Sequence, residues 1–265
     1  MNNEVVLRVD NLSVQYLNTG ILIKNINFSI SRGKVLGLLG ESGSGKSTVC
    51  NAVLGVLDNN AAKITGSVTL LGKEILPLSW DMREHINGKD IGVVLQNPMT
   101  AFDPCMKIQG HFTETLCPHL LCSKRDALLY GLNILARVGL HDGKRIMNSY
   151  SFQLSGGMLQ RTMVALAIAL NPVLLIADEP TTALDYGSMS IILELLSFIM
   201  RDCRPAMLLV SHNMNVMSAL ANDVAVMKNG RIIEQGSPYI IRNEPKNEYT
   251  KELMYATNIL ETMQC

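Results

Sequence analysis

One short segment has the residues and the spacing of a loop that binds phosphate. Residues 40–47 read GESGSGKS and match the pattern G-x-x-x-x-G-K-[ST]. Glycine lets backbone amides approach phosphate oxygens closely, and the amino end of a following helix adds a favourable dipole. We expect Lys46 to reach the outer phosphates and Ser47 to bind Mg²⁺. The predicted nucleotide-binding residues here are Gly40, Glu41, Ser42, Gly43, Ser44, Gly45, Lys46, Ser47 and Thr48.

A pair of acidic residues lies farther along the chain, at the end of an apolar run. Residues 174–177 are Leu-Leu-Ile-Ala, and Asp178 and Glu179 follow them. After a buried strand, an Asp in this place can bind Mg²⁺ and a Glu can activate a water molecule. An isolated acidic pair is about as often a solvated strand end, so the catalytic interpretation depends on the phosphate-binding loop being present as well.

Short apolar runs place both motifs at the ends of predicted strands. The loop at 40–47 follows one such run and precedes residues 46–57, whose apolar positions have helical spacing. From residue 98 to about 150 the strand pattern gives way to helix-compatible sequence, which predicts a helical insertion. Strands that alternate with helices predict an α/β fold with a largely parallel sheet. The expected strands are residues 5–9, 25–30, 35–39, 68–71, 91–95, 173–177, 207–210 and 224–227.

Composition disfavours several other classes of protein. The 265 residues contain 23 basic and 23 acidic side chains without a long run of like charge, so we expect no nucleic acid as a partner. The longest apolar run, residues 163–170, is far shorter than the ~20 residues that span a bilayer. The amino terminus lacks the features of a secretory signal, so we expect a cytoplasmic protein whose six cysteines form no disulfides.

A third motif lies between the other two. Residues 154–157 read LSGG, and with this segment the chain resembles the ABC ATPase family. The resemblance covers nearly the whole chain, because Tyr16, Gln96, the sequence Ala-Leu-Asp at 183–185 and His212 match further family elements in order. It implies a P-loop NTPase core with a largely parallel sheet, an antiparallel N-terminal β subdomain and an inserted α-helical subdomain.

The resemblance also implies which residues carry out catalysis. Glu179 is expected to activate the attacking water, and His212 to contact the γ-phosphate of ATP. Gln96 is expected to sense Mg²⁺ and the water while linking the core to the helical insertion. The implied Mg²⁺ ligands are Ser47, Gln96 and Asp178.

Other matched residues are implied to contact nucleotide or a second subunit. Tyr16 is expected to stack on adenine. Ser155, Gly156 and Gly157 are expected to hold the γ-phosphate of ATP that is bound to the opposite subunit, where helix-start amides suit an anion. Asp185 is expected to communicate across the dimer.

A single ATP-binding domain is expected over residues 1–265. Residues 1–97 and 161–240 would form the ATPase core, residues 98–160 the helical subdomain with the LSGG motif, and residues 241–265 a C-terminal helical tail. The resemblance further implies a peripheral position at the cytoplasmic face of the inner membrane. There, two ATPase subunits would drive two membrane permease subunits, supplied by an extracytoplasmic substrate-binding protein.

Residues beside the motifs indicate a branch of the family. Met158 directly after LSGG, Gln160-Arg161 and the segment at 97–104 resemble the peptide and nickel importer branch. Peptide-type members commonly have a longer, cysteine-containing C-terminal segment, and this sequence ends at Cys265 without one. We therefore expect the ATPase of a nickel importer, paired with a second, related ATPase in a heterodimer. The ATPase of a di/oligopeptide or other chelated-metal importer is the alternative.

Three other interpretations are less well supported. A non-transport ABC ATPase usually carries two ATPase units or a long coiled coil, and residues 47–154 are too few for that coil. A nucleotide-binding module without hydrolysis is disfavoured by Glu179 and His212. Cys117, His119 and Cys122 bring metal-binding side chains together, but their spacing matches no standard zinc pattern and ordinary packing is favoured.

Overall fold

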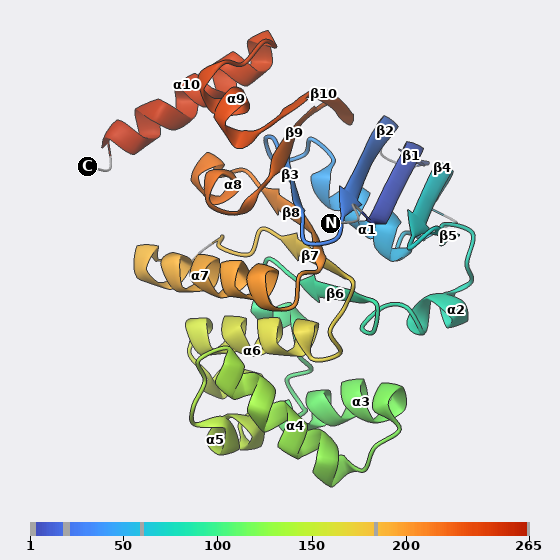
Figure 1. Ribbon diagram of the computed structural model, residues 1–265, viewed down its shortest axis with the longest axis vertical. Helices are drawn as coiled ribbons and strands as arrows, with labels where there is room; N and C mark the ends of the chain where they lie inside the picture. Colours follow the sequence, from blue (N-terminus) through green and yellow to red (C-terminus); the bar gives the residue numbers. More distant parts are fainter. Residues whose placement is uncertain (1–3, 18–21, 59–60, 183–184, 264–265) are drawn as a thin grey trace.

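Two sheets and the helices around them make up the protein (Figure 1). The computed structural model describes residues 4–17, 22–58, 61–182 and 185–263. The strands are β1 (Val5–Tyr16), β2 (Leu22–Ser31), β3 (Val35–Leu39), β4 (Ala62–Leu70), β5 (Lys73–Glu74), β6 (Ile91–Val94), β7 (Leu174–Asp178), β8 (Ala206–Ser211), β9 (Asp223–Lys228) and β10 (Arg231–Gly236). The α-helices are α1 (Lys46–Leu54), α2 (Trp80–Glu84), α3 (Ile108–Leu120), α4 (Lys124–Arg137), α5 (Gly143–Asn148), α6 (Gly156–Ile168), α7 (Tyr186–Asp202), α8 (Met214–Leu220), α9 (Pro238–Asn243) and α10 (Glu248–Met263). The 3₁₀ turns are η1 (Pro98–Ala101) and η2 (Ser151–Gln153).

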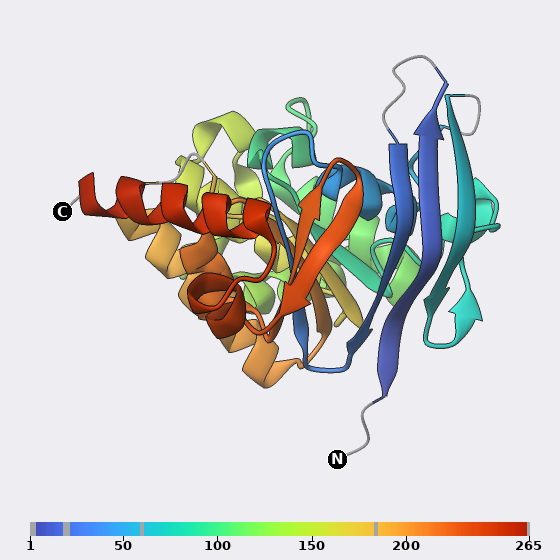
Figure 2. The ribbon, with the colours of Figure 1, turned by 90° about the horizontal axis from the view of Figure 1, so that it is seen from above.

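The smaller sheet is antiparallel and has the order β2-β1-β4-β5. In β1, Leu7 and Val9 are buried while Arg8 between them is exposed, which is the alternation of a sheet with one face on the core. A register shift between Val9 and Leu12 lets Leu12 and Val14 return to the buried face. Figure 2 shows this sheet at one side of the molecule, away from the carboxyl end of α10.

The larger sheet has the order β10-β9-β3-β8-β7-β6, and the strands from β9 to β6 are parallel. β10 is antiparallel to β9 and follows the turn at Asn229-Gly230, where both residues have positive φ, as a two-residue hairpin turn requires. All five residues of β3 are buried, because structure covers both faces of the sheet at its centre.

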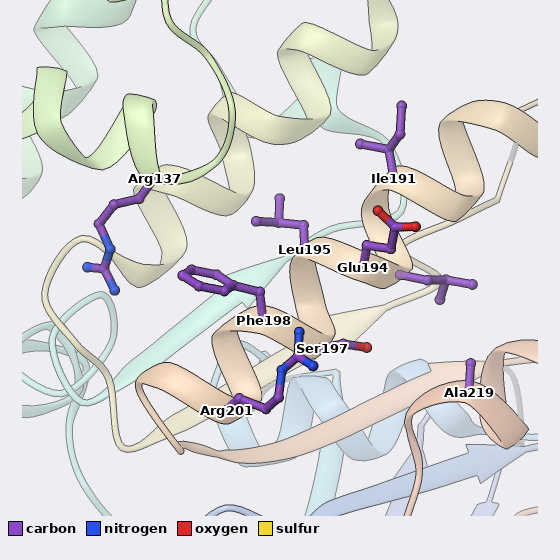
Figure 3. Close-up of a pocket in the computed structure, with 9 residues that line it drawn as sticks. Arg137, Ile191, Glu194, Leu195, Ser197, Phe198, Arg201 and Ala219 are labelled. Atoms are coloured by element: carbon purple, nitrogen blue, oxygen red, sulfur yellow. The ribbon is translucent and has the colours of Figure 1, made fainter.

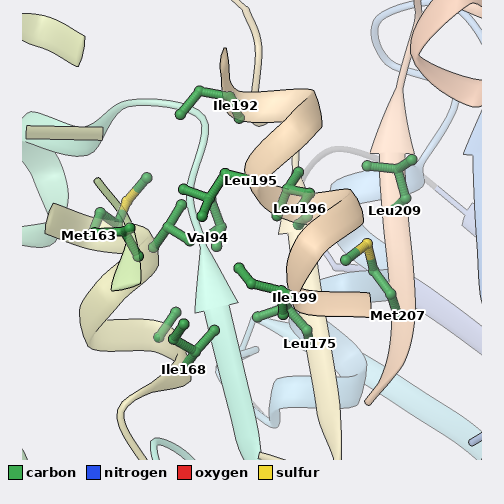
Figure 4. Packing of buried hydrophobic residues seen from close by; sticks show 14 of the residues in the cluster. Val94, Met163, Ile168, Leu175, Ile192, Leu195, Leu196, Ile199, Met207 and Leu209 are labelled. Atoms are coloured by element: carbon green, nitrogen blue, oxygen red, sulfur yellow. The ribbon is translucent and has the colours of Figure 1, made fainter. Parts of the chain in front are cut away.

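Apolar side chains fix the larger sheet from both faces. On one face, Leu175 of β7 packs with Met163 of α6 and Ile199 of α7 (Figure 4). On the other, Leu38 of β3 belongs to a cluster that includes Val53 of α1 and the inner face of the antiparallel sheet. With both faces packed, the strand ends are held in fixed relative positions.

Helices α3, α4 and α5 lie together at the end of the molecule opposite α10 (Figure 1). Phe112 and Leu116 of α3, Leu135 of α4 and Ile146 of α5 are buried among one another and against α6. α6 therefore lies between this helical layer and the sheet, and it contacts both.

The structure confirms the predicted α/β fold, its largely parallel sheet and its antiparallel N-terminal sheet. β1 continues to Tyr16, well beyond the predicted end at residue 9. α1 ends at Leu54 instead of residue 57, because Gly55 adopts the left-handed conformation with a φ of 69°. The subdomain boundaries stay a prediction, and α6 continues through the boundary proposed at residue 160.

Two further expectations concern cysteines and membrane spans. The cysteines in the described part of the chain are all free, and Cys265 lies outside that part. Among the described helices, none combines the length and the apolar character needed to cross a bilayer. Pro118, which separates Cys117 from His119 in the sequence, lies inside the last turn of α3.

Candidate nucleotide-binding and hydrolysis site

The predicted catalytic residues follow four neighbouring strands of the larger sheet. Strands β3, β8, β7 and β6 are adjacent and parallel, so their carboxyl ends meet at one edge. The phosphate-binding loop begins after β3, and His212 follows β8. Glu179 follows β7, and Gln96 lies just after β6. The topology of the sheet thus brings together residues that are far apart in the sequence.

The phosphate-binding loop depends on two glycines. At Gly40 a Cβ atom would collide with the carbonyl oxygen of Met227. Gly45 has a φ of 106° and stands directly before α1, in a conformation that other residues rarely adopt. Between them, the amide of Ser44 donates to the carbonyl oxygen of Glu41 at 3.2 Å and closes a turn. The loop therefore leads into the amino end of a helix, where an anion is stabilised.

The Lys46 side chain is buried within this loop. Its Nζ atom donates to the carbonyl oxygens of Gly40 at 2.8 Å and Glu41 at 2.9 Å. Burial lowers the pKa of Lys46, and the nearby carboxylates of Glu179 and Asp178 act in the opposite direction. The amine therefore lies between the loop backbone and the acidic pair, where it can pair with phosphate oxygens.

Asp178 and Ser47 supply oxygen atoms that suit Mg²⁺. Burial raises the pKa of Asp178 above its usual value, and a hydrogen bond with Ser47 opposes this shift without cancelling it. The Oδ1 atom of Asp178 is buried and has no hydrogen-bond partner among the described residues. Such an atom is costly to bury unless a cation binds it. Hard oxygen ligands from Asp and Ser match the preference of Mg²⁺, which would neutralise phosphate charge when bound.

Glu179 is held at both of its carboxylate oxygens. The Nδ1 atom of His212 lies 2.9 Å from Oε1, and the hydroxyl of Thr182 donates to Oε2 at 2.8 Å. The backbone of Glu179 has a φ of 50°, in the left-handed region that non-glycine residues seldom occupy and that often marks functional sites. Its side chain is 12% exposed, whereas that of His212 is 61% exposed. The carboxylate is therefore oriented by the protein, as a general base should be.

One cavity of about 650 Å³, a volume within the range of small-molecule sites, is lined by Lys46, Glu179 and His212 together. Three of its lining residues belong to α10 and were not predicted as site residues. The only signal in the sequence is that Tyr249, Leu253 and Ala256 recur at the spacing of one helix face. The cavity is lined by Gly40, Glu41, Ser42, Gly43, Gly45, Lys46, Ser47, Thr48, Gln96, Glu179, His212, Leu253, Ala256 and Thr257.

Several predicted residues lie outside the described lining of this cavity, among them Ser44, Asp178, Tyr16 and Asp185. Tyr16 is half-buried at the end of β1, where it packs against the cluster beneath the antiparallel sheet. Asp185 caps α7, and its carboxylate accepts from the amide of Ser188 at 3.0 Å and from the hydroxyl of Ser188 at 2.6 Å. These hydrogen bonds lower the pKa of Asp185. Residues 183–184, which matched the same family element, lie outside the described residues.

The LSGG residues begin α6 and also lie outside the cavity lining. Ser155 caps the helix, and its Oγ atom accepts from the amide of Met158 at 3.4 Å. Ser155 and Gly156 are exposed, and Gly157 is partly exposed. An exposed helix start of this kind can offer amides to an anion on another molecule. Contact with ATP of an opposite subunit stays a prediction.

Gln160 makes a contact close to Glu179 that the motif alone did not reveal. It lies on α6, one turn after the LSGG segment, and its side chain is buried. Its Nε2 atom donates to the carbonyl oxygen of Pro180 at 2.9 Å, directly after Glu179. The helix that carries LSGG is therefore linked by a buried hydrogen bond to the loop that carries the general base.

A second cavity, of about 670 Å³, lies where α7 faces α4 and α8 (Figure 3). Arg137, Glu194, Phe198 and Arg201 are among its lining residues, and the predicted nucleotide-binding residues are not. This cavity lies away from the strand ends that carry the phosphate-binding loop. The chemistry therefore belongs to the cavity beside Lys46 and Glu179.

The cysteines of α3 and the following turn behave as packing residues. Cys117 and Cys122 lie against the apolar cluster of the helical layer. Within the described residues, no group of three or more His, Cys, Asp and Glu side chains is arranged to hold a metal ion.

Comparison with known proteins agrees with the geometry of the site. The sequence model of the family described as ABC transporter matches residues 23–182, more than half of the chain. The chain belongs to the ABC transporter family. ABC ATPases bind ATP, with Mg²⁺ as the usual cofactor, and hydrolyse it, so the protein is an ATPase of an ABC transporter.

Two curated relatives of this ABC ATPase cover most of its length. It is 38% identical over 266 residues to the oligopeptide transport ATP-binding protein OppD of Lactococcus lactis subsp. cremoris. This match covers 99% of this chain and 79% of the relative. It is 40% identical over 233 residues to the metal-staphylopine import system ATP-binding protein CntD of Staphylococcus aureus. This match covers 88% of this chain and 86% of the relative.

Solved structures show the same ABC ATPase fold. The dimeric, post-hydrolysis state of the ATP-binding cassette MJ0796 bound to ADP and Pi has a TM-score of 0.76 and 27% identity, over 88% of this chain and 98% of that one. The structure of cbiO1 from Clostridium perfringens, part of the ABC transporter complex cbiONQ, has a TM-score of 0.75 and 26% identity, over 97% and 95%.

Proposed function

We propose that this ATPase energises an ABC importer and that the importer takes up nickel. The observation that supports a working motor is the cavity in which Glu179, His212 and Gln96 face the phosphate-binding loop. A protein that only bound nucleotide would not need a carboxylate held at both oxygens beside that loop.

In this proposal, hydrolysis proceeds by attack of water on the γ-phosphate of ATP. Glu179 accepts a proton from the water, while His212 and Thr182 keep its carboxylate oriented. Lys46 and the loop amides hold the phosphates, and bound Mg²⁺ neutralises the charge that develops on them. The separated roles explain why one set of residues should govern affinity and another should govern turnover.

The assembly is proposed to contain a second, related ATPase, so that the two form a heterodimer. The exposed start of α6 at Ser155 would face ATP on that partner, and the dimeric MJ0796 structure supports such an arrangement. Movement would pass through Gln96 to the helical layer and from there to two membrane permease subunits at the cytoplasmic face of the membrane. An extracytoplasmic substrate-binding protein would select the cargo.

Nickel is proposed as cargo because of residues beside the motifs and because of one relative. Met158 and the segment at 97–104 resemble the peptide and nickel importer branch. The CntD relative is named for import of metal-staphylopine, which supports a metal as cargo. The OppD relative favours one second candidate, uptake of an oligopeptide.

A deletion strain separates these cargoes. We expect loss of the gene to reduce uptake of radioactive nickel at low external concentration, and excess nickel to restore nickel-dependent enzyme activity by other routes. The intact gene should rescue uptake and the Lys46→Ala gene should not. If nickel uptake is unchanged while uptake of a labelled peptide or of another chelated metal is lost, the importer assignment survives and nickel is excluded.

A further inference from the structure

Helix α10 contributes to the ATP cavity in a way that the phosphate-binding, LSGG and acidic motifs do not describe. Leu253, Ala256 and Thr257 all line the cavity and carry no charge. They recur on one face of α10, which begins beside the β9–β10 hairpin and extends away from it towards the C-terminus (Figure 2). We propose that α10 is a wall of the nucleotide site that sets nucleotide affinity, and that Tyr249 positions the phosphate-binding loop.

Tyr249 connects α10 directly to the phosphate-binding loop. Its side chain is buried, with 7% of the residue exposed, and its Oη atom accepts from the amide of Glu41 at 3.4 Å. Burial raises the pKa of Tyr249, so the phenol keeps its proton. The Nζ atom of Lys228 lies over the Tyr249 ring, 4.1 Å from its centre, and this cation–π contact helps to hold the ring in place. A residue on α10 thus forms a hydrogen bond with a backbone amide of the phosphate-binding loop.

The base of α10 and the loop share one support, the β9–β10 hairpin. Glu234 of β10 accepts from the amides of Lys246 and Asn247 at 2.7 and 3.1 Å, just before α10 begins. At the turn of the same hairpin, the amide of Gly230 donates to the carbonyl oxygen of Ser44 at 3.0 Å. The segment that leads into α10 and the phosphate-binding loop are therefore both hydrogen-bonded to one hairpin, the first through the Glu234 side chain and the second through the backbone of Gly230.

Packing against the core accounts for the residue types on only one face of α10. Met254 is 4% exposed and belongs to the apolar cluster, so that face of the helix is anchored like any amphipathic helix. Ala256 is exposed and lines the cavity instead. The side chains of the described residues leave the space in front of it open, and a ligand in the cavity would meet this face of the helix.

The first test fills the cavity from α10. In the purified full-length protein, Ala256→Trp places a large side chain in the cavity, and we expect it to weaken binding of a fluorescent ATP analogue by about tenfold or more. The matched control is Tyr255→Trp, because Tyr255 is the adjacent residue, is 70% exposed and is absent from the described lining. Binding that is equally strong in both variants, with unchanged melting temperature, overturns the proposal.

The second test removes only the hydrogen bond to the loop. Tyr249→Phe keeps the ring and its contact with Lys228 but deletes the oxygen that accepts from Glu41. We expect the KM for ATP to rise about twofold to tenfold, the usual range for one hydrogen bond, while kcat changes by less than about twofold. Tyr255→Phe should change neither constant. A fall in kcat at constant KM would contradict a role in positioning the loop for binding.

Both tests are independent of the proposed cargo. They measure ATP binding and hydrolysis on the protein itself, so an importer of peptide instead of nickel would give the same results. If Ala256→Trp does not fold, the KM of Tyr249→Phe decides the question alone, because that substitution removes one atom and leaves the packing in place.

Discussion

Thr182 should control the rate of hydrolysis without contacting nucleotide. Thr182→Val replaces the hydroxyl that donates to Oε2 of Glu179 at 2.8 Å and keeps nearly the same shape. A hydrogen bond to a charged group contributes about 1.5–3 kcal/mol, and Glu179 is 12% exposed, so water substitutes poorly for the lost donor. If this bond orients the base in the transition state, kcat should fall by about 10-fold to 100-fold.

The measurement is steady-state ATPase activity of the assembled transporter. KM should stay within about twofold of the wild-type value, because Thr182 lies outside the described lining of the cavity and the binding contacts remain. Thr182→Ser retains the hydroxyl and serves as the matched control, with a much smaller loss of rate. Combined with His212→Ala, which removes the contact to the other carboxylate oxygen, Thr182→Val should show an effect that is not additive. A Thr182→Val protein that folds normally and keeps full kcat would refute the reasoning.

Four other substitutions separate binding, turnover and packing. Lys46→Ala should weaken ATP binding about 100-fold, and Glu179→Gln should bind ATP normally while losing most of its turnover, as equilibrium binding and single-turnover assays would show. Ser155→Arg should leave ATP binding by the isolated subunit intact and abolish turnover of the complex; weaker binding by a folded monomer would contradict this. Gly92→Ala should lower the free energy of unfolding in urea by about 1–3 kcal/mol, because its Cβ atom would collide with the carbonyl oxygen of Ala167.

The sequence predicted the elements that carry the chemistry because their signals are local. The glycine pattern at 40–47 can be recognised without the rest of the fold, since it depends on backbone conformations within a few residues. The predicted strand at 35–39 and the helix after the loop are both present, although Gly55 ends that helix early. Family resemblance added Gln96 and His212, which the structure places in the same cavity.

Only the tertiary structure showed how distant residues support the site. The sequence did not predict the contacts of Thr182 and Gln160, because these contacts depend on a single carboxylate or carbonyl oxygen of another residue. Tyr16 is the opposite case. Its match to the family predicted a contact with adenine, but Tyr16 lies outside the described lining of the cavity.

By itself, the sequence determined that this protein has a phosphate-binding loop between a strand and a helix, an acidic pair at a strand end and an LSGG helix start. These features follow from local backbone geometry and from the periodicity of apolar residues. The tertiary structure decided that α10 closes one side of the cavity and that Tyr249 meets Glu41, 208 positions earlier. Such contacts depend on the packing of whole elements against one another. Local patterns of residue types therefore do not predict which helix face will contact which loop.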